Sequence, residues 1–525
     1  MNRPRTRFAQ RHAQAITHGV LAAALLGGLL WLGGLLWPVA LPGSLPAHLQ
    51  CVSYAPFRLS GESPLRKHAH ISRARIDHDL AVLARHFDCV RTYSVNQGLD
   101  QVPALAVRRG MQVLLGIWIG PDARANAREI ALGIATARAA PAGSIRAIVV
   151  GNEVLLRGDQ SASVLLRDLH AVRAATGLPV TYADVPAFWL RHPQLAPAVN
   201  FISVNMLPYW DNKPVSARAA VTRVARQLRR VQAAFPGKPV FISETGWPSA
   251  GRARRDAVPS RVNEAAYLRD FIAWAQAHGQ RYNLIEAYDQ PWKRALEGTV
   301  GGWWGIDDSR AQPKFAWRGS VTEDPRAGWA LLPLLLGAAV GAWRGARGAR
   351  ACGLLAGAGT GLALWALWRM AQAAAWDGAQ WTYWGALGGG LLVGAWLLLD
   401  ALRTLLRSAR IAHPGRVAQV AFAALFAVVY LDLLLVFDGR YRDWPLPAFI
   451  PIALGVALLR QLHGAPLLHG PRARALALAA LLLGMVGVLQ EALLNPYAWC
   501  WLALNALLAW TALGAGKPAA PAQSL

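Results

Sequence analysis

Residues 147–153 read AIVVGNE, and residues 239–247 read PVFISETGW. Each segment contains a short apolar run, rich in β-branched residues. The run ends at a glutamate, which is Glu153 in the first segment and Glu244 in the second. Such a run is typical of a strand buried on both faces, as in a parallel sheet covered by helices. A glutamate directly after a buried strand is costly to keep there unless it has a purpose.

Six more runs of this kind lie between residues 48 and 320, and charged helical stretches separate them. Strands alternating with helices over ~250 residues predict a (β/α)₈ TIM barrel, which belongs to the α/β class. The alternative is a doubly wound open sheet, but the glycine motif that would favour it does not follow the first strand. The six runs begin at Cys51, Cys89, Gln112, Pro179, Phe201 and Asn283.

The chain changes character after Gly328, where it becomes almost entirely apolar. Charged residues make up 16% of the sequence, below the ~25% of an average soluble protein. Residues 328–514 are therefore predicted to be an all-α, polytopic membrane domain of about seven helices. The expected spans are 328–343, 351–368, 381–402, 417–437, 445–459, 474–494 and 497–513.

The N-terminus has a basic segment, residues 1–18, followed by a nearly unbroken apolar segment, residues 19–37. The apolar segment is longer than the core of a typical signal peptide, so it is predicted to be a transmembrane anchor. A cleaved signal peptide is the alternative. In both cases the following segment, residues 48–320, is exported.

The formal net charge of +25 does not indicate a nucleic-acid partner, because basic runs interleaved with stacking aromatics are lacking. Many arginines instead lie in alternate loops between the apolar spans. The positive-inside rule then predicts that residues 1–18 are cytoplasmic and that the barrel faces the periplasm of a bacterial inner membrane. The arginine-rich loops contain Arg344, Arg347, Arg350, Arg403, Arg407, Arg410, Arg416, Arg460, Arg472 and Arg474.

Glu153 and Glu244 are the candidate catalytic residues. Active sites of such barrels lie at the carboxyl ends of the strands, and strands four and seven lie across the mouth from each other. Two facing carboxyl groups are the minimum needed to cleave a glycosidic bond, one as acid and one as nucleophile or base. The structural alternative is that each glutamate only caps the next helix.

In the motifs that end these strands, the sequence resembles glycoside hydrolase family 17, the β-1,3-glucanases and glucanosyltransferases. The resemblance covers roughly residues 50–318. By that resemblance Glu153 is the acid/base, Glu244 is the nucleophile, and the chemistry retains the anomeric configuration. Bacterial members are often membrane-associated enzymes of β-glucan synthesis or remodelling. The motifs are SYAPF from Ser53, RTYS from Arg91, GNE from Gly151, NMLPYW from Asn205, ETGWPS from Glu244 and EAYDQPWK from Glu286.

Further residues of these motifs are candidates for binding sugar. Asn152 is suited to bond the sugar 2-hydroxyl, and the tyrosines to orient Glu244 or bond a hydroxyl. Tryptophans are suited to stack on pyranose rings, although aromatics in a barrel are more often packing residues. Gln290 replaces an acidic residue common in bacterial relatives. The candidates are Tyr54, Arg91, Tyr93, Trp118, Asn152, Tyr209, Trp247, Glu286, Lys293, Trp303 and Trp304.

No cofactor or metal is expected, because the sequence contains no cluster of His, Cys or Asp with metal-ligand spacing. Cys51 and Cys89 fall in neighbouring predicted strands and form either a disulfide or two buried thiols. Asp400, Asp432 and Glu491 fall in or beside apolar spans, where polar contacts or a transport role would explain them. The expected partners are a β-glucan, the lipid bilayer and, as an open alternative, a glucan-synthesising protein. The rival function is a non-catalytic glucan-binding or glucan-export component.

Overall fold

The computed structural model describes residues 7–343, 349–408 and 410–513. The chain divides into two compact units. The barrel unit combines Val39–Gly251 with Asp256–Val321, and the helical unit combines the segments before, between and after them. Part of the predicted cytoplasmic segment 1–18 and the last residue of the predicted membrane domain lie outside the described residues.

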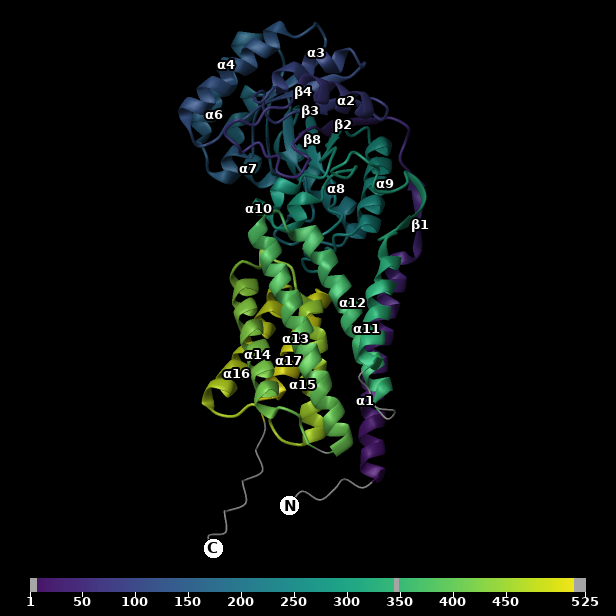
Figure 1. The fold of residues 1–525 in the computed structure, drawn as a ribbon. Helices are drawn as coiled ribbons and strands as arrows, with labels where there is room; N and C mark the ends of the chain where they lie inside the picture. The colour runs from purple at the N-terminus through teal and green to yellow at the C-terminus, as the bar shows by residue number, and fades with distance from the viewer. Residues whose placement is uncertain (1–6, 344–348, 409, 514–525) are drawn as a thin grey trace. The chain divides into compact units, whose positions relative to one another are not determined.

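The eight predicted strands form one closed, all-parallel barrel in chain order, from β2 to β9 (Figure 1). The predicted TIM barrel is confirmed, and the open-sheet alternative is wrong, because the last strand pairs with the first and closes the sheet. The strands are β2 (Leu49–Ser53), β3 (Phe87–Arg91), β4 (Gln112–Ile117), β5 (Ile145–Asn152), β6 (Val180–Asp184), β7 (Ile202–Asn205), β8 (Val240–Thr245) and β9 (Tyr282–Leu284).

Side chains alternate along each strand between the barrel axis and the surrounding helices. On β4, Val113 and Leu115 pack in the large core against the helices, whereas Leu114 lies in a separate small cluster with Ala147 and Val149 of β5. Glu153 has the same parity as Ala147 and Val149, so it continues the axis-facing row beyond the end of β5. The small cluster consists of Cys51, Cys89, Leu114, Ala147, Val149, Ala183 and Phe241.

Helices cover the outside of the barrel, as the charged stretches between the strands predict. A two-stranded sheet of β1 (Pro38–Ser44) and β10 (Arg318–Thr322) joins the two ends of the barrel segment and was not expected from the sequence. The longer covering helices are α2 (Arg73–Leu83), α3 (Val102–Val107), α4 (Ala123–Ala139), α6 (Ala162–Thr176), α7 (Pro186–Arg191), α8 (Ala217–Ala234) and α9 (Arg261–Ala277).

The helical unit has a helix in every apolar range that the sequence singles out. Among the described residues, six helices are long and apolar enough to cross a membrane, whereas α11 and α17 are shorter. The helices are α1 (Arg7–Leu36), α11 (Leu331–Trp343), α12 (Arg350–Ala374), α13 (Gly378–Ser408), α14 (Pro414–Phe437), α15 (Leu446–His463), α16 (Pro471–Gln490) and α17 (Pro496–Trp510).

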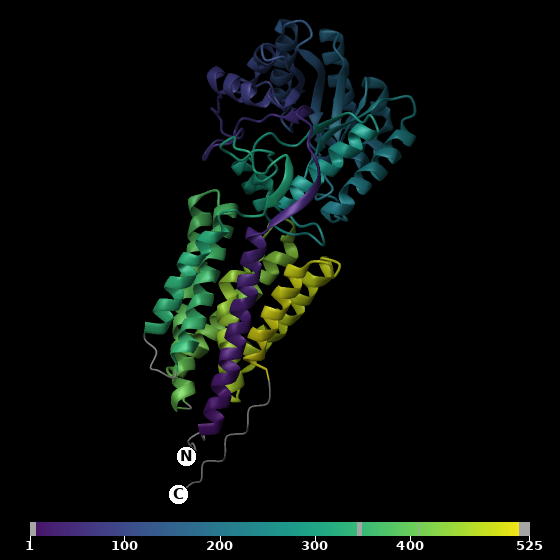
Figure 2. The ribbon, with the colours of Figure 1, turned by 90° about the vertical axis from the view of Figure 1, so that its right-hand side faces the viewer.

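Glycines bring α11 and α12 into backbone contact. A Cβ atom at Gly337 would lie 2.2 Å from the carbonyl oxygen of Gly357, and one at Gly341 would lie 2.0 Å from that of Gly353. Small residues of this kind allow helices to pack closely in lipid. Close packing matters there because lipid tails are as apolar as the side chains, so no hydrophobic effect drives the helices together. The N-terminal helix α1 packs on the same hairpin, with Leu32 beside α12 (Figure 2).

The carboxyl groups near the apolar spans have polar contacts within the helical unit. Asp432, on α14, accepts hydrogen bonds from Trp501 Nε1 at 2.6 Å and from Asn505 Nδ2 at 2.8 Å, both on α17. Glu491 pairs with the guanidinium of Arg252, which belongs to this unit, at 2.6 Å. Asp400 is exposed. The contacts of Asp432 and Glu491 are sufficient to explain why these two acids are tolerated there.

Candidate active site

Glu153 lies one residue beyond β5, and Glu244 lies near the carboxyl end of β8. The backbone of Glu153 has φ 54°, in the left-handed region that non-glycine residues seldom adopt. Two backbone hydrogen bonds hold it there: its N–H donates to Ala183 on β6, and its carbonyl accepts from Arg157. The sharp change of direction at the strand end therefore turns the glutamate into the barrel mouth.

Glu244 is 3% exposed and accepts two short hydrogen bonds at one oxygen, Oε1. Arg91 Nη1 donates at 2.9 Å, and the hydroxyl of Tyr93 donates at 2.8 Å. Arg91 is itself fully buried, and its guanidinium also stacks over the Tyr93 ring at 4.7 Å. An arginine and a phenol that donate to the same oxygen hold this buried carboxyl group in one orientation.

Glu153 has a contrasting environment. A neutral amide, Asn205 Nδ2, donates to its Oε1 at 2.9 Å. Burial, followed by the negative charge of Glu244, raises the pKa of Glu153 to about 7, whereas the Asn205 hydrogen bond lowers it. A carboxyl group with a pKa near neutrality can hold a proton and then release it, as a general acid/base requires.

A hydrogen-bond network joins the two glutamates through Asn152. The side-chain oxygen of Asn152 accepts from Arg91 Nη2 at 2.7 Å and from Asn205 Nδ2 at 3.1 Å. Asn205 in turn accepts from Ser243 Oγ at 2.8 Å. Because the Asn152 oxygen is engaged by these donors, the amide nitrogen is the group of this side chain that can donate to another partner.

Glu286 and Lys293 form an ion pair in which both side chains are largely buried. Burial lowers the pKa of Lys293, while the negative charges of Glu297, Glu244 and Glu153 act in the opposite direction. The charges of Glu153 and Glu244 thus act on Lys293. The structure thus brings together Arg91, Tyr93, Asn152, Glu153, Glu244, Glu286 and Lys293 among the residues singled out in the sequence.

The other predicted sugar-binding residues are mostly packing residues. Tyr54 and Tyr209 are fully buried, and Trp247 and Trp304 are 1% and 2% exposed. The hydroxyl of Tyr54 donates to Asp79 on α2, and Trp247 Nε1 donates to the carbonyl of Val258. Trp303 is half-buried, and Trp118 is 40% exposed, so these two tryptophans retain ring surface for a ligand.

Asn205 is the residue of the site that the sequence did not single out for a role. It stands first in the motif NMLPYW, and its position at the end of β7 was the available signal. Sequence motifs did not show that its amide would bond both Glu153 and Asn152. That contact depends on closure of the barrel, which places β7 between β5 and β8 around the mouth.

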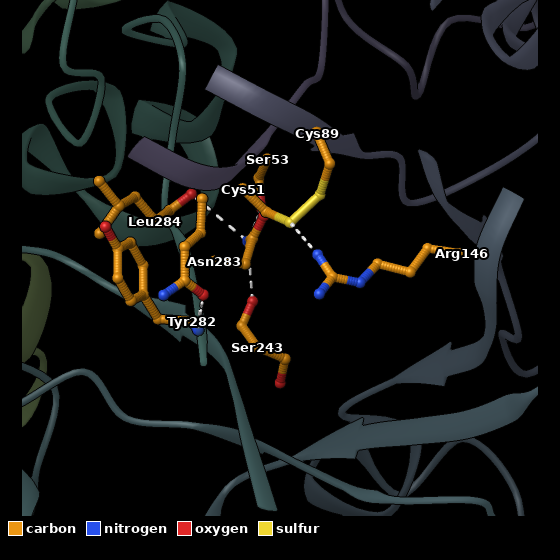
Figure 3. Close-up of a disulfide and its surroundings, with 9 residues drawn as sticks. Cys51, Ser53, Cys89, Arg146, Ser243, Tyr282, Asn283 and Leu284 are labelled. Atoms are coloured by element: carbon orange, nitrogen blue, oxygen red, sulfur yellow. Dashed lines mark hydrogen bonds between the residues drawn. A yellow bond between two sulfur atoms is a disulfide. The ribbon is translucent and has the colours of Figure 1, made fainter. Parts of the chain in front are cut away.

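A disulfide joins Cys51 to Cys89 below the carboxylates. These cysteines are direct partners in the β2–β3 register, with Cα atoms 4.5 Å apart, and they belong to the axis-facing cluster. Figure 3 shows Asn283 beside them, donating to Ser53 Oγ at 2.8 Å and to the carbonyl of Ser243 at 2.9 Å. Of the two alternatives for these cysteines, the structure forms the bond.

Metal ligands are not gathered anywhere in the described part of the chain: no three His, Cys, Asp or Glu residues there are placed to hold an ion. The site is built from two carboxyl groups in unequal environments, with an arginine, a tyrosine and two amides around them. A pair of carboxyl groups is the minimum that cleavage of a glycosidic bond requires.

Residues 51–305 match the BtgE/BtgC glycoside hydrolase domain. A probable β-glucosidase btgE of Neosartorya fischeri is 28% identical over 233 residues, which are 43% of this chain and 41% of that protein. A glucan 1,3-β-glucosidase of Candida albicans is 29% identical over 261 residues, or 45% of this chain and 84% of that protein. The chain thus spans less than half the length of the Neosartorya relative.

Among solved structures, the glycoside hydrolase family 17 β-1,3-glucanosyltransferase of Rhizomucor miehei is 26% identical, with a TM-score of 0.45. The match covers 50% of this chain and 94% of that one. The domain match lies in the barrel unit and includes both Glu153 and Glu244. These sequence relatives, both from fungi, support a glycoside hydrolase domain of the β-1,3-glucan type in the barrel unit.

The pKa of Glu153 predicts the alkaline limb of the pH–activity profile. Because the acid must be protonated, kcat/KM should fall about tenfold per pH unit above pH about 7. Asn205→Ala removes a hydrogen bond that lowers this pKa, so the limb should move to higher pH. The measurement is kcat/KM across pH for both proteins. A limb that stays in place, or moves to lower pH, would contradict this account of Glu153.

Proposed function

We propose that this chain is a retaining enzyme acting on β-1,3-glucan through a covalent glucosyl-enzyme, at the outer face of a bacterial cytoplasmic membrane. The observation that carries the proposal is the difference between the two glutamates. Glu244 is bonded to a guanidinium and a phenol, whereas Glu153 is bonded to a neutral amide and has a pKa near 7. Two carboxyl groups in such unequal environments are suited to the roles of nucleophile and acid, respectively.

In the first step the carboxylate of Glu244 attacks the anomeric carbon of the glucosyl unit, and the glycosidic C–O bond breaks. Glu153 gives its proton to the departing oxygen, so the leaving glucan is released as an alcohol. In the second step Glu153, now ionised, takes a proton from the acceptor hydroxyl. The acceptor oxygen bonds to the anomeric carbon, and Glu244 is released as a carboxylate. Two inversions at one carbon retain its configuration.

The residues around the pair have separate tasks in this scheme. Arg91 and Tyr93 orient Glu244, and they stabilise its charge when the nucleophile is regenerated. Asn205 holds Glu153 in reach of the leaving oxygen. The amide nitrogen of Asn152 is suited to bond the 2-hydroxyl of the glucosyl unit, an interaction that strengthens in the transition state.

The acceptor is either water or another glucan, so the reaction is hydrolysis or transglucosylation. Acceptor stacking by Trp247, Trp303 and Trp304 would favour transfer by keeping water from the intermediate. Trp247 and Trp304 are buried, so only Trp303 of these three retains surface for such a contact. Incubation with laminarihexaose distinguishes the outcomes, since products longer than the starting sugar require transfer.

The location rests on three observations. Six helices of the described chain have the length and hydropathy to cross a bilayer. Arginines concentrate in alternate loops of the sequence, which supports a cytoplasmic position for residues 1–18 and an outer position for the barrel. The Cys51–Cys89 disulfide fits an oxidising compartment.

The alternative function is a non-catalytic glucan-binding or glucan-export component, for which the helical unit would be the working part. The hydrogen-bonded and unequal environments of the two glutamates favour the enzyme, since a binding protein has no need to separate their protonation states. A glucan-synthesising partner in the membrane is compatible with either function. Such a partner should co-purify in mild detergent, and its consistent absence would remove that part of the proposal.

Substitution of the two glutamates tests the proposed function. Glu244→Gln should abolish turnover of every substrate, because no glucosyl-enzyme can form. Glu153→Gln should abolish cleavage of laminari-oligosaccharides but keep measurable activity on an aryl β-glucoside whose phenol leaves without protonation. The measurements are product release from both substrates by the full-length protein in detergent. Equal loss on both substrates for both variants, or full activity of Glu244→Gln, would overturn the assignment.

Reporter fusions test the orientation. Alkaline phosphatase fused after Ser320 should be active, because that point is on the outer side and the reporter folds only where disulfides form. Fusion after Arg407 should be inactive, because the positive-inside rule places that loop in the cytoplasm. A cytoplasmic reporter such as β-galactosidase, fused at the same two points, is the matched control and should give the opposite pattern. The reversed result would exclude an outward-facing barrel.

A further inference from the structure

We propose that Trp118 forms a stacking platform for one glucosyl unit of the bound glucan. This unit is not one of the two glucosyl units that flank the cleaved bond. The inference rests on the proposed function and extends it to the length of sugar that the barrel recognises. Trp118 follows β4 directly, at the carboxyl end of the barrel, where the neighbouring strand β5 leads into Glu153. It therefore stands on the catalytic side of the fold.

Strand parity directs Trp118 toward the barrel axis. Leu114 belongs to the axis-facing cluster, and Gly116 and Trp118 follow it in the same parity. At Gly116 the backbone of Thr92 and Tyr93 occupies the place of a side chain, since a Cβ atom there would lie 2.1 Å from the Thr92 carbonyl oxygen. The first large side chain of this row beyond Leu114 is thus the indole of Trp118.

The indole is fixed in place, although the residue is 40% exposed. The guanidinium of Arg157 lies over one face of the ring, 4.3 Å from its centre. Arg157 is itself anchored, since its Nη2 donates to the Ile119 carbonyl at 2.7 Å and its Nη1 donates to the carbonyl of Asn152. Arg157 thus connects the platform to the residue that precedes the acid/base.

The backbone of the platform is also held by a buried acid. Glu129 on α4 is 3% exposed and accepts from the N–H of Trp118 at 3.3 Å and the N–H of Val95 at 2.9 Å. It also accepts from Ser94 Oγ at 2.7 Å. One carboxyl group therefore ties the loops after β3 and β4 together. A large aromatic ring that is exposed yet rigid loses little conformational entropy when a ligand stacks on it.

The contrast with the other tryptophans supports this assignment. Trp247 and Trp304 are buried by other aromatic rings, so they are explained by packing. Trp118, by contrast, is 40% exposed, and its ring contacts the Arg157 guanidinium. The apolar face of a glucosyl ring is the ligand surface that such a platform fits, and the hydroxyls of that ring remain free for polar contacts.

The test compares substrates of different length in the full-length protein. The measured quantity is the ratio of kcat/KM for laminarihexaose to kcat/KM for laminaritriose. Trp118→Ala should lower this ratio about tenfold, the size expected when one aromatic contact to the longer substrate is lost. Trp118→Tyr should restore part of it, because a phenol ring can still stack. Leu65→Ala, which removes another exposed apolar side chain of the barrel unit, should leave the ratio at its original value.

A binding measurement separates this inference from folding and from the proposed function. In the inert Glu244→Gln background, Trp118→Ala should weaken binding of laminarihexaose by calorimetry about tenfold while the melting temperature stays within a few degrees. An unchanged length ratio and unchanged affinity for Trp118→Ala would overturn the platform and leave the enzyme intact. A parent protein with no activity on either oligosaccharide would instead overturn the proposed function.

Discussion

The buried guanidinium of Arg91 is the interaction on which the rest of the site depends. It donates to Glu244 on β8 and to Asn152 at the end of β5, so one side chain from β3 fixes groups on two other strands. Removing one partner of a buried ion pair typically costs about 3–5 kcal/mol, because the remaining charge stays buried. The pair therefore holds the Glu244 carboxyl group in one orientation inside the barrel.

The same constraint explains the layers beneath the catalytic pair. The disulfide and the small apolar residues close the axis, and above them Ser53, Ser243 and Asn283 form a polar layer. Tyr93 donates to Glu244 and is hydrogen-bonded to the hydroxyl of Ser53, so this layer connects directly to Glu244. Because the members of this layer have partners across the axis, substitution of one would disturb the orientation of others. The geometry of the nucleophile is thus a property of the closed barrel.

Much of this arrangement was predictable from the sequence. Apolar strand runs and their spacing predicted all eight barrel strands, because a strand buried on both faces has a recognisable composition. The glutamates after two of those runs marked the carboxyl ends of β5 and β8. The burial of Tyr54, Tyr209, Trp247 and Trp304 was not predictable, since aromatic packing depends on tertiary neighbours and not on the strand pattern. The same limit hid the role of Asn205, whose partners come from β5, and the glycine contact between α11 and α12.

Trapping the covalent intermediate tests the central claim most directly. A laminaribiosyl fluoride with fluorine at the 2-position of the reacting sugar slows both steps, and its reactive leaving group allows the glucosyl-enzyme to accumulate. Incubation followed by proteolysis and mass spectrometry should find the sugar on the peptide that contains Glu244, and Arg91→Met should greatly slow its formation. Label on a peptide that contains Glu153, or no label while substrate is consumed with inversion, would contradict the account.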